Sequence, residues 1–243
     1  MFPGPERVAG VRARIDAIDW AAAGAALEAH GVARIPRLLS ARECRTLALL
    51  WSERARFRSA VVMERLRFGR GEYRYFARPL PPLVARLRTA LYPPLAGIAN
   101  DWRAAVGGGE PFPPRLEEFL GRCAAHGQRR PTPLLLRYGP GDFNCLHQDR
   151  YGAVVFPLQV AIGLDRPGRD YVGGEFLLLE QRPRAQSRGT SITLAQGEAV
   201  VFPSWARPVA GRRGVYRAAV RHGASQVIRG LRRVLGIIFH DAA

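Results

Sequence analysis

Lysine is absent from this sequence. Its 37 basic residues are therefore all arginines, and they outnumber the 20 acidic residues to give a formal net charge of +17 at pH 7. This balance excludes an acidic or neutral protein. Arginine fits carboxylates and phosphates better than lysine does, but avoidance of lysine alongside abundant alanine, glycine and proline is also typical of a GC-rich genome. The charge alone therefore leaves the partner open.

Cysteines and long apolar runs are also scarce. The three cysteines, Cys44, Cys123 and Cys145, are widely spaced and form no CxxC pair, which argues against a disulfide framework and a zinc–thiolate site and suits a reducing cytoplasm. The longest apolar stretch, residues 153–164, contains Pro157 and is too short to span a bilayer. Because the N-terminus also shows no secretory pattern, we expect a soluble cytoplasmic protein with no membrane partner.

A length of 243 residues and a hydrophobic fraction of 47% allow one large core. The first part of the chain, residues 1–130, is predicted to be mainly helical. A helical pattern over residues 20–30 ends at Gly31. Ser40 and Glu43 match a capping box, in which each side chain satisfies a free amide at the start of the next helix.

The rest of this first part is less regular. Residues 32–35 are apolar enough for a short strand. Aromatic and arginine residues interleave with glycine over residues 67–78, which favours a hairpin or an extended loop. A helix is predicted from Pro82 with an interruption at Pro93–Pro94, and a further helix is predicted over residues 115–125.

Residues 131–243 show a different pattern. Short segments rich in β-forming residues alternate with Gly-Pro, Pro-Gly and Gly-Gly turns, which predicts a sandwich or barrel. The fold class is therefore predicted to be α+β: a double-stranded β-helix (jelly roll, cupin-like) over residues 131–243, with residues 1–130 as a mainly helical support or lid layer packed against it as one unit. The predicted strands are residues 134–138, 154–164, 176–179, 199–202, 215–220 and 234–239.

One pattern in this half carries chemistry. His147 and Asp149 form a His-x-Asp pair just after a Gly-Pro-Gly turn, and alternate residues of a strand point to the same face. An imidazole and a carboxylate can then reach one metal ion, and His222, in a late strand, is the candidate third ligand. Two histidines and one carboxylate leave three positions open on an octahedral ion, which suits non-haem Fe(II) binding a cosubstrate and dioxygen together.

A cosubstrate partner is predicted near the last strand, where Arg232 lies ten residues beyond His222. 2-Oxoglutarate would chelate iron through its keto-acid end and leave a distal carboxylate, for which a bidentate arginine is a good partner. Arg232 and Arg233 point to opposite faces of a strand, so only one of them can serve. Tyr138, nine residues before His147, could donate its hydroxyl to the same carboxylate.

The combined pattern resembles the 2-oxoglutarate- and Fe(II)-dependent dioxygenases over the β-rich half of the chain. Residues 137–149, which contain Arg-Tyr-Gly-Pro-Gly and then Leu-His-Gln-Asp, are similar to AlkB-type nucleic-acid demethylases. The Gly-Gly-Glu at residues 173–175 and the spacing from His222 to Arg232 look more like prolyl-hydroxylase-type members, and this spacing selects Arg232 over Arg233. The whole chain also resembles a bacterial family of oxygenases that act on alkylated DNA.

The resemblance implies an enzyme that uses Fe(II), 2-oxoglutarate and dioxygen, in which three residues bind the metal and two bind the cosubstrate. The predicted reaction is oxidative demethylation or hydroxylation of alkylated bases in DNA or RNA. The alternative is a hydroxylase of a protein (prolyl-type) or of a small molecule, and the ligand set argues against a non-catalytic nucleic-acid binder. No obligate protein partner is indicated. The implied metal ligands are His147, Asp149 and His222, and the implied cosubstrate residues are Arg232 and Tyr138.

Substrate contacts are predicted in the interleaved segment. Arg67, Tyr73, Arg74 and Tyr75 combine rings on which bases stack with guanidinium groups that hold phosphates, and a base must leave its stack to enter such a pocket. The alternative is that these aromatic residues are half-buried in a strand and that the arginines are ordinary surface. A second cluster precedes His222 and would extend a basic rim: Arg207, Arg212, Arg213, Arg217 and Arg221.

A few residues near these motifs are predicted to have no catalytic role. Gln148 lies between two ligand positions but points to the other face of the strand, so it is interpreted as structural. His126 and His240 are predicted to be surface groups. Leu136 stands two residues before Tyr138, where AlkB enzymes place an asparagine.

Overall fold

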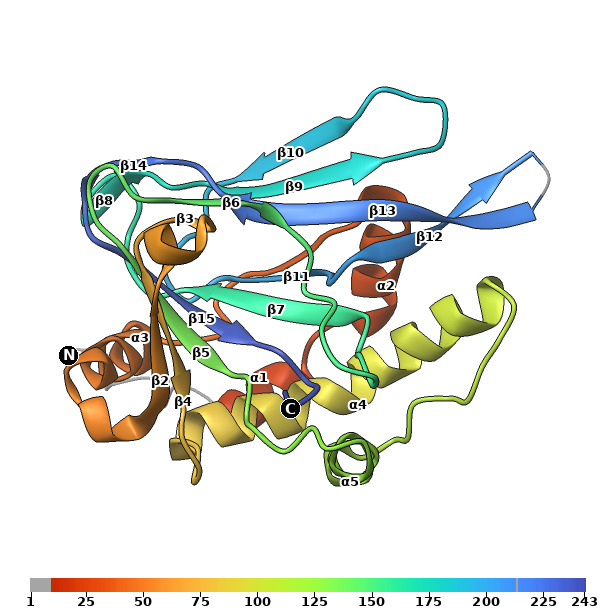
Figure 1. The fold of residues 1–243 in the computed structure, drawn as a ribbon, viewed down its shortest axis with the longest axis horizontal. Helices are drawn as coiled ribbons and strands as arrows, with labels where there is room; N and C mark the ends of the chain where they lie inside the picture. The colour runs from red at the N-terminus through yellow and green to blue at the C-terminus, as the bar shows by residue number, and fades with distance from the viewer. Residues whose placement is uncertain (1–9, 213) are drawn as a thin grey trace, which may run out of the picture.

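The computed structural model describes residues 10–212 and 214–243. Two antiparallel sheets form its upper and middle layers, and the helices lie below or beside the middle layer (Figure 1). This is the predicted α+β jelly-roll architecture. The larger sheet has the strand order β1 (Ala33–Ile35), β11 (Ala199–Pro203), β7 (Leu158–Gly163), β15 (Arg232–Ile237), β5 (Leu134–Tyr138), β4 (Glu72–Phe76) and β2 (Phe57–Val62).

The smaller sheet faces the larger one across the inner core. Its central strand, β13, also pairs with β12 to form a long hairpin. A separate pair, β14 (Val227–Gly230) and β8 (Tyr171–Gly173), closes one end. The smaller sheet has the order β10 (Arg188–Ile192), β9 (Phe176–Gln181), β13 (Gly214–Ala224), β6 (Phe143–His147) and β3 (Gly69–Arg70), with β12 (Ala206–Gly211) beside β13.

The helices lie in the first part of the chain. Within the described residues, no helix is both long enough and apolar enough to cross a membrane. The α-helices are α1 (Val11–Asp16), α2 (Trp20–His30), α3 (Ala41–Leu49), α4 (Pro82–Ala105) and α5 (Leu116–Ala125), and short 3-10 turns cover Leu50–Ser52, Arg54–Arg56 and Met63–Leu66.

Local sequence chemistry explains where several helices begin and end. Helix α2 has the predicted bounds, and Gly31 ends it in the left-handed conformation with φ of +73°, which glycine adopts without strain. Helix α3 begins with the predicted capping box, in which the Ser40 hydroxyl accepts the Glu43 N–H and the Glu43 carboxylate accepts the Ser40 N–H. These local rules therefore held where a side chain satisfied the helix end.

The predicted interruption at Pro93–Pro94 is wrong. Helix α4 runs through both prolines without a break. An internal proline removes a backbone hydrogen bond and costs about 3 kcal/mol or more, but the buried face of this helix compensates for that cost. Leu91, Tyr92 and Leu95 around the prolines are all fully buried, so packing against the core keeps the segment helical.

The region up to residue 130 contributes strands as well as helices. β1, β2 and β4 extend the larger sheet at its two edges, and β3 extends the smaller one. The interleaved segment of residues 67–78 is thus only partly a hairpin: β4 pairs with β2 on one side and with β5 on the other. Strands of this region are therefore hydrogen-bonded directly into the β-roll.

The core has two layers. The outer layer lies between the helices and the larger sheet, where Phe156 packs its ring 5.2 Å from both Tyr92 and Phe239. The inner layer lies between the two sheets, where Phe176 and Phe202 pack 4.7 Å apart. The inner layer fills only part of the space between the sheets, and the rest is a cavity.

Candidate metal and cosubstrate site

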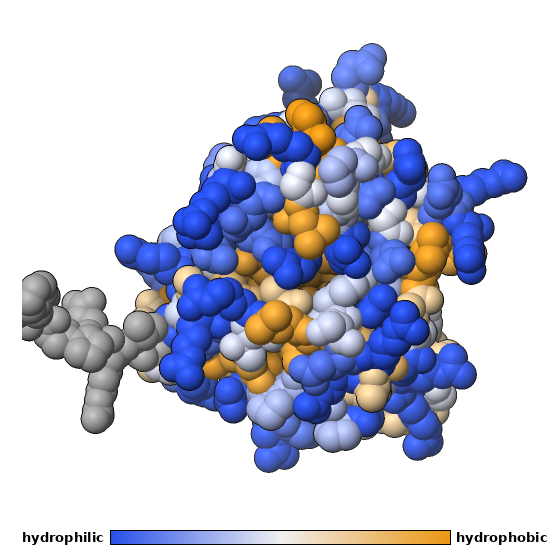
Figure 2. Space-filling model, turned by 90° about the vertical axis from the view of Figure 1, so that its left-hand side faces the viewer, coloured by the Kyte–Doolittle hydropathy of each residue, from blue (hydrophilic) through white to orange (hydrophobic). Residues whose placement is uncertain are grey.

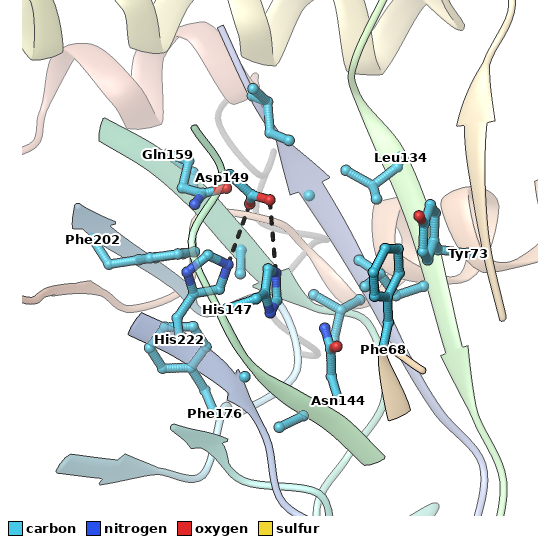
Figure 3. A pocket seen from close by; sticks show the side chains of 18 of the residues that line it. Phe68, Tyr73, Leu134, Asn144, His147, Asp149, Gln159, Phe176, Phe202 and His222 are labelled. Atoms are coloured by element: carbon cyan, nitrogen blue, oxygen red, sulfur yellow. Dashed lines mark ion pairs between the residues drawn. The ribbon is translucent and has the colours of Figure 1, made fainter. Parts of the chain in front are cut away.

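Three side chains from two paired strands and an adjoining loop converge on one point (Figure 3). His147 is the last residue of β6, and His222 lies directly opposite it in β13. The Asp149 carboxylate lies 3.7 Å from His147 Nε2 and 3.3 Å from His222 Nε2. One ligand atom from each residue falls within 4.8 Å of the others. The structure therefore brings together the three residues predicted as the metal triad.

Asp149 reaches this point by a loop and not by strand alternation. Strand β6 ends at His147, so the expectation that both side chains share one strand face is corrected. The Asp149 N–H donates to the Ser204 carbonyl at 3.0 Å. The Gln148 side-chain amide donates to the Trp205 carbonyl at 2.8 Å, which is a structural contact. Gln148 also lines the same cavity as the triad, so the expectation that it points to the other face is wrong. Backbone of the 203–206 segment thus fixes the carboxylate.

The pKa shifts of Asp149 and His222 suit a metal ion. Burial alone would raise the pKa of Asp149, but its hydrogen bond to His222 and the charges of both histidines lower that pKa to about 2. Burial lowers the pKa of His222 despite its contact with Asp149. The His147 Nδ1 lies 2.8 Å from the Cys145 carbonyl, so Nδ1 carries the proton and Nε2 is free to bind. Divalent metals bind the ionised carboxylate and the neutral imidazole, and the lowered pKa of Asp149 and of His222 favours these forms.

Arg232 and Tyr138 lie opposite each other in the paired strands β15 and β5. Arg232 is 4% exposed, its guanidinium carbon lies 5.3 Å from the centre of the Tyr138 ring, and its Nε has no hydrogen-bond partner. Arg233 points to the opposite face, as predicted, where it forms a bidentate pair with Asp165 at 2.5 and 3.0 Å. A buried cation that lacks a full set of acceptors is prepared for an anion.

One cavity of about 310 Å³ joins these two groups. Its lining includes the three triad residues at one place and Arg232 and Tyr138 at another. Figure 2 views the molecule from the left of Figure 1 and shows a hollow with hydrophobic side chains at its floor, ringed by hydrophilic ones. The end that carries the three candidate metal ligands and the end that carries Arg232 therefore open into one space.

Residues 71–242 match the sequence model of an oxygenase family described as catalysing oxidative methylation of damaged DNA. The chain belongs to this family. An uncharacterized protein of Mycobacterium tuberculosis (strain ATCC 25618 / H37Rv) is 53% identical over 168 residues, which are 69% of this chain and 72% of that protein. A protein of the same description from strain CDC 1551 / Oshkosh matches to the same extent.

The oxygenase shares its fold with solved 2-oxoglutarate- and Fe(II)-dependent enzymes. A Pseudomonas putida prolyl-4-hydroxylase aligns with a TM-score of 0.56 at 16% identity, over 92% of this chain and 99% of that one. A 2OG-Fe(II) oxygenase family oxidoreductase from Burkholderia pseudomallei aligns with a TM-score of 0.51 at 17% identity, over 93% and 94%. The carbocyclase SnoK, described as α-ketoglutarate-dependent, aligns with a TM-score of 0.51 at 15% identity, over 93% and 85%.

Two residues of the oxygenase site were not found from the sequence. Gly174, with φ of +65°, lies against the Arg232 stem, and a Cβ there would fall 2.7 Å from Arg232 Cδ. The Gly-Gly motif was the available signal. Asn144 lines the cavity and hydrogen-bonds the Tyr138 hydroxyl, so an amide is present although Leu136 replaces the AlkB asparagine. An irregularity in the β6–β13 pairing brings Asn144 and His147 to the same cavity, and sequence alternation does not reveal such a bulge.

The predicted substrate residues separate into two groups. Tyr73 and Tyr75 line the cavity, with their rings 5.4 Å apart in an edge-on arrangement. Arg74 points to the other face of β4, where it stacks 4.1 Å over Trp51 and donates to the Trp51 carbonyl at 2.8 Å. Arg67 is exposed at the end of a 3-10 turn and is not among the cavity residues. The structure therefore assigns only the two tyrosines to the cavity wall.

The second arginine cluster is also divided. Arg207 is 2% exposed and pairs with Glu180 at 2.5 Å, so the expectation that it extends a basic rim is wrong: a buried carboxylate neutralises it. Arg212, Arg217 and Arg221 are exposed, and Arg213 lies outside the described residues.

The two histidines predicted to lie on the surface differ. His126 is exposed as predicted. The same prediction is wrong for His240, which is fully buried. Its Nδ1 accepts the Phe156 N–H at 3.3 Å, and its ring packs 5.1 Å from that of Tyr151, a residue of the cavity wall.

Proposed function

We propose that this oxygenase uses Fe(II), 2-oxoglutarate and dioxygen to oxidise an alkyl group on a base of damaged nucleic acid. The observation that carries the proposal is the placement of three metal-ligating side chains and the incompletely bonded guanidinium of Arg232 in one cavity. These two ends match the keto-acid and distal carboxylate ends of 2-oxoglutarate. The family description supports damaged DNA as the substrate.

The chain supplies binding and orientation. Bound iron and 2-oxoglutarate supply the oxidation, in which the cosubstrate and dioxygen give succinate and carbon dioxide while one oxygen atom enters a substrate C–H bond. His147, Asp149 and His222 would hold the metal on one side and leave its other positions open. Arg232 would pair with the distal carboxylate. The buried Tyr138 hydroxyl would donate to the same group, because burial raises its pKa well above the ordinary value and keeps it protonated.

The substrate end of the cavity is aromatic and uncharged. Tyr73, Tyr75 and Tyr151 line it, and burial raises the pKa of each hydroxyl, so all three act as neutral donors and acceptors. Phe68 adds a partly exposed ring at the cavity wall. A flat, neutral group with hydrogen-bonding edges, such as a base turned out of its stack, fits these surfaces. A hydroxylated N-methyl group would then be released as formaldehyde and leave the restored base.

The proposal is tested by succinate release with iron and 2-oxoglutarate present. A methylated oligonucleotide is compared with the same oligonucleotide without the methyl group and with a proline-containing peptide. We expect the methylated oligonucleotide alone to stimulate succinate release, with one formaldehyde formed per succinate. Stimulation by the peptide alone would overturn the nucleic-acid assignment and leave the iron and 2-oxoglutarate chemistry intact.

A second candidate function is hydroxylation of a prolyl residue in a protein. The spacing from His222 to Arg232 supports it, and so does the fold similarity to the Pseudomonas putida prolyl-4-hydroxylase. Hydroxylation at a proline ring carbon leaves the oxygen on the peptide and releases no formaldehyde. The peptide's mass therefore distinguishes the two candidates, because it rises by one oxygen atom only in the second case.

A further inference from the structure

A second cavity of about 300 Å³ lies at the C-terminal end of α4, beneath the β12–β13 hairpin. Figure 1 shows this hairpin extending above the end of α4 on the right of the molecule. The cavity walls carry three large aromatic side chains, and no acidic residue is among the described residues that line it. The aromatic residues are Trp102, Phe112 and Trp205, and the basic ones are Arg103, Arg207 and Arg217.

The positive charge at this cavity is only partly balanced. Glu180 neutralises Arg207. Arg103 is half-buried and stacks 4.1 Å over the Phe112 ring. Arg103 also donates to the Glu110 carbonyl. Burial lowers the pKa of Arg103, the charge of Glu110 opposes this shift, and the charges of Arg122 and Arg217 add to it. Arg217 is exposed and forms no ion pair within the part of the chain that the structure describes. Two arginines that repel each other across an aromatic cavity are stabilised when an anion binds between them.

The shape and chemistry of the lining restrict what that anion can be. Flat indole and phenyl faces next to guanidinium groups bind planar rings that carry a negative charge. The cavity volume of about 300 Å³ is close to that of the catalytic cavity, about 310 Å³. The cavity therefore suits one nucleotide, with the base against the aromatic residues and the phosphate against the arginines.

The two cavities share a wall. Gln148 lines the catalytic cavity and donates at 2.8 Å to the carbonyl of Trp205, which lines the second one. The Arg150 guanidinium lies 6.0 Å from the centre of the Trp205 ring. The wall that holds Asp149 in place therefore also faces the second cavity.

We propose that the second cavity binds another nucleotide of the strand that carries the damaged base, with its phosphate held by Arg103 and Arg217 and its base stacked against Trp205. That this nucleotide belongs to the strand with the damaged base rests on the proposed function. The presence of a nucleotide site rests on the cavity itself and can be tested without turnover.

The test measures binding of an unmodified single-stranded DNA 10-mer by fluorescence anisotropy, without iron or 2-oxoglutarate. The variant is Arg103→Gln/Arg217→Gln. The control is Arg42→Gln/Arg45→Gln, which removes the same charge from exposed positions on α3, at the other end of the molecule. We expect the Kd of the first variant to rise at least tenfold. The magnitude of the slope of log K against log salt should fall by about 0.7, since the two arginines hold one phosphate and each neutralised phosphate on a single strand contributes about 0.7.

Arg217→Gln alone provides a second measurement, because this exposed side chain can be replaced without disturbing the Phe112 stack. We expect Arg217→Gln to raise the Kd for the DNA 10-mer as well, with about half the change in the slope of log K against log salt. Wild-type affinity in both variants, or an equal loss in the control, would overturn the site. Arginine-dependent binding without oxidation of any methylated oligonucleotide would instead refute the proposed function and leave the second site standing.

Discussion

Replacing Arg232 by Gln tests the cosubstrate assignment most directly. The side chain is 4% exposed, and its Nε has no partner, so the distal carboxylate of 2-oxoglutarate would lose its buried cation. Removing one partner of such a pair costs about 2–5 kcal/mol, which corresponds to about a 30- to 4,000-fold rise in Kd. Because Gln keeps one donor, we expect about a 100-fold rise, near the lower end of this range.

The assay is calorimetric titration of 2-oxoglutarate into protein loaded with Mn²⁺, which replaces Fe²⁺ without redox chemistry. Arg232→Lys keeps the positive charge but loses the paired donors of the guanidinium, so we expect a Kd between those of wild type and Arg232→Gln. Arg233→Gln is the matched control: its guanidinium pairs with Asp165 on the other face of β15, so it should lower the Tm and leave the Kd within about twofold of wild type. Wild-type affinity in Arg232→Gln, or an equal loss in Arg233→Gln, would refute the assignment.

Three further predictions concern the residues around this site. Gly174→Ala should raise the Kd for 2-oxoglutarate about tenfold, since its Cβ would lie 2.7 Å from Arg232 Cδ. The control is Gly189→Ala, which has no atom within 4 Å of its Cβ and should leave this Kd unchanged. Equal effects of the two variants would exclude a role for the contact between Gly174 and Arg232. Asp149→Ala should abolish Mn²⁺ binding, followed by electron paramagnetic resonance, and succinate release; full succinate release with iron supplied would show that the metal assignment is wrong. Burial lowers the pKa of His240 to about 4, so protonation opposes folding and stability is lost as pH falls below the unfolded-state value of about 6.5. His240 should contribute a drop of about 2 kcal/mol in the free energy of unfolding in urea from pH 7 to pH 5. His240→Gln should lose this contribution and keep the one from His222, whose pKa burial also lowers. An unchanged pH dependence in the variant would show that another group is responsible.

Sequence reasoning succeeded where a local rule determines the structure. The bounds of α2 follow from helical periodicity and Gly31, and the start of α3 follows from Ser40 and Glu43. The side chains of Arg232 and Arg233 point to opposite faces of β15, which follows from strand alternation alone. In each case, neighbouring residues supply the whole physical cause, so no knowledge of the tertiary fold is needed.

Two of the wrong predictions, and one residue that the sequence did not reveal, depend on contacts between distant parts of the chain. Pro93–Pro94 should end a helix by local rules, but burial of the surrounding side chains in the core keeps α4 intact. His240 looks like a polar residue near a chain end, yet residues of other segments enclose it. Asn144 reaches the cavity only because the β6–β13 pairing is irregular. Tertiary packing and pairing register, which a single sequence does not reveal, decided all three.

The excess of arginine shows why the site could be only partly predicted. An arginine next to a buried carboxylate is already satisfied, as Arg207 is by Glu180 and Arg233 is by Asp165. These partners lie 27 and 68 residues away in the sequence, so the sequence does not show which arginines are neutralised. A guanidinium is available to a ligand only when the fold withholds such a partner. The structure does so at two cavities: Arg232 has an unbonded Nε at the first, and Arg217 has no ion pair with any described residue at the second. The arginines that the fold leaves without an acidic partner therefore indicate where an anionic ligand binds, whereas the total net charge does not.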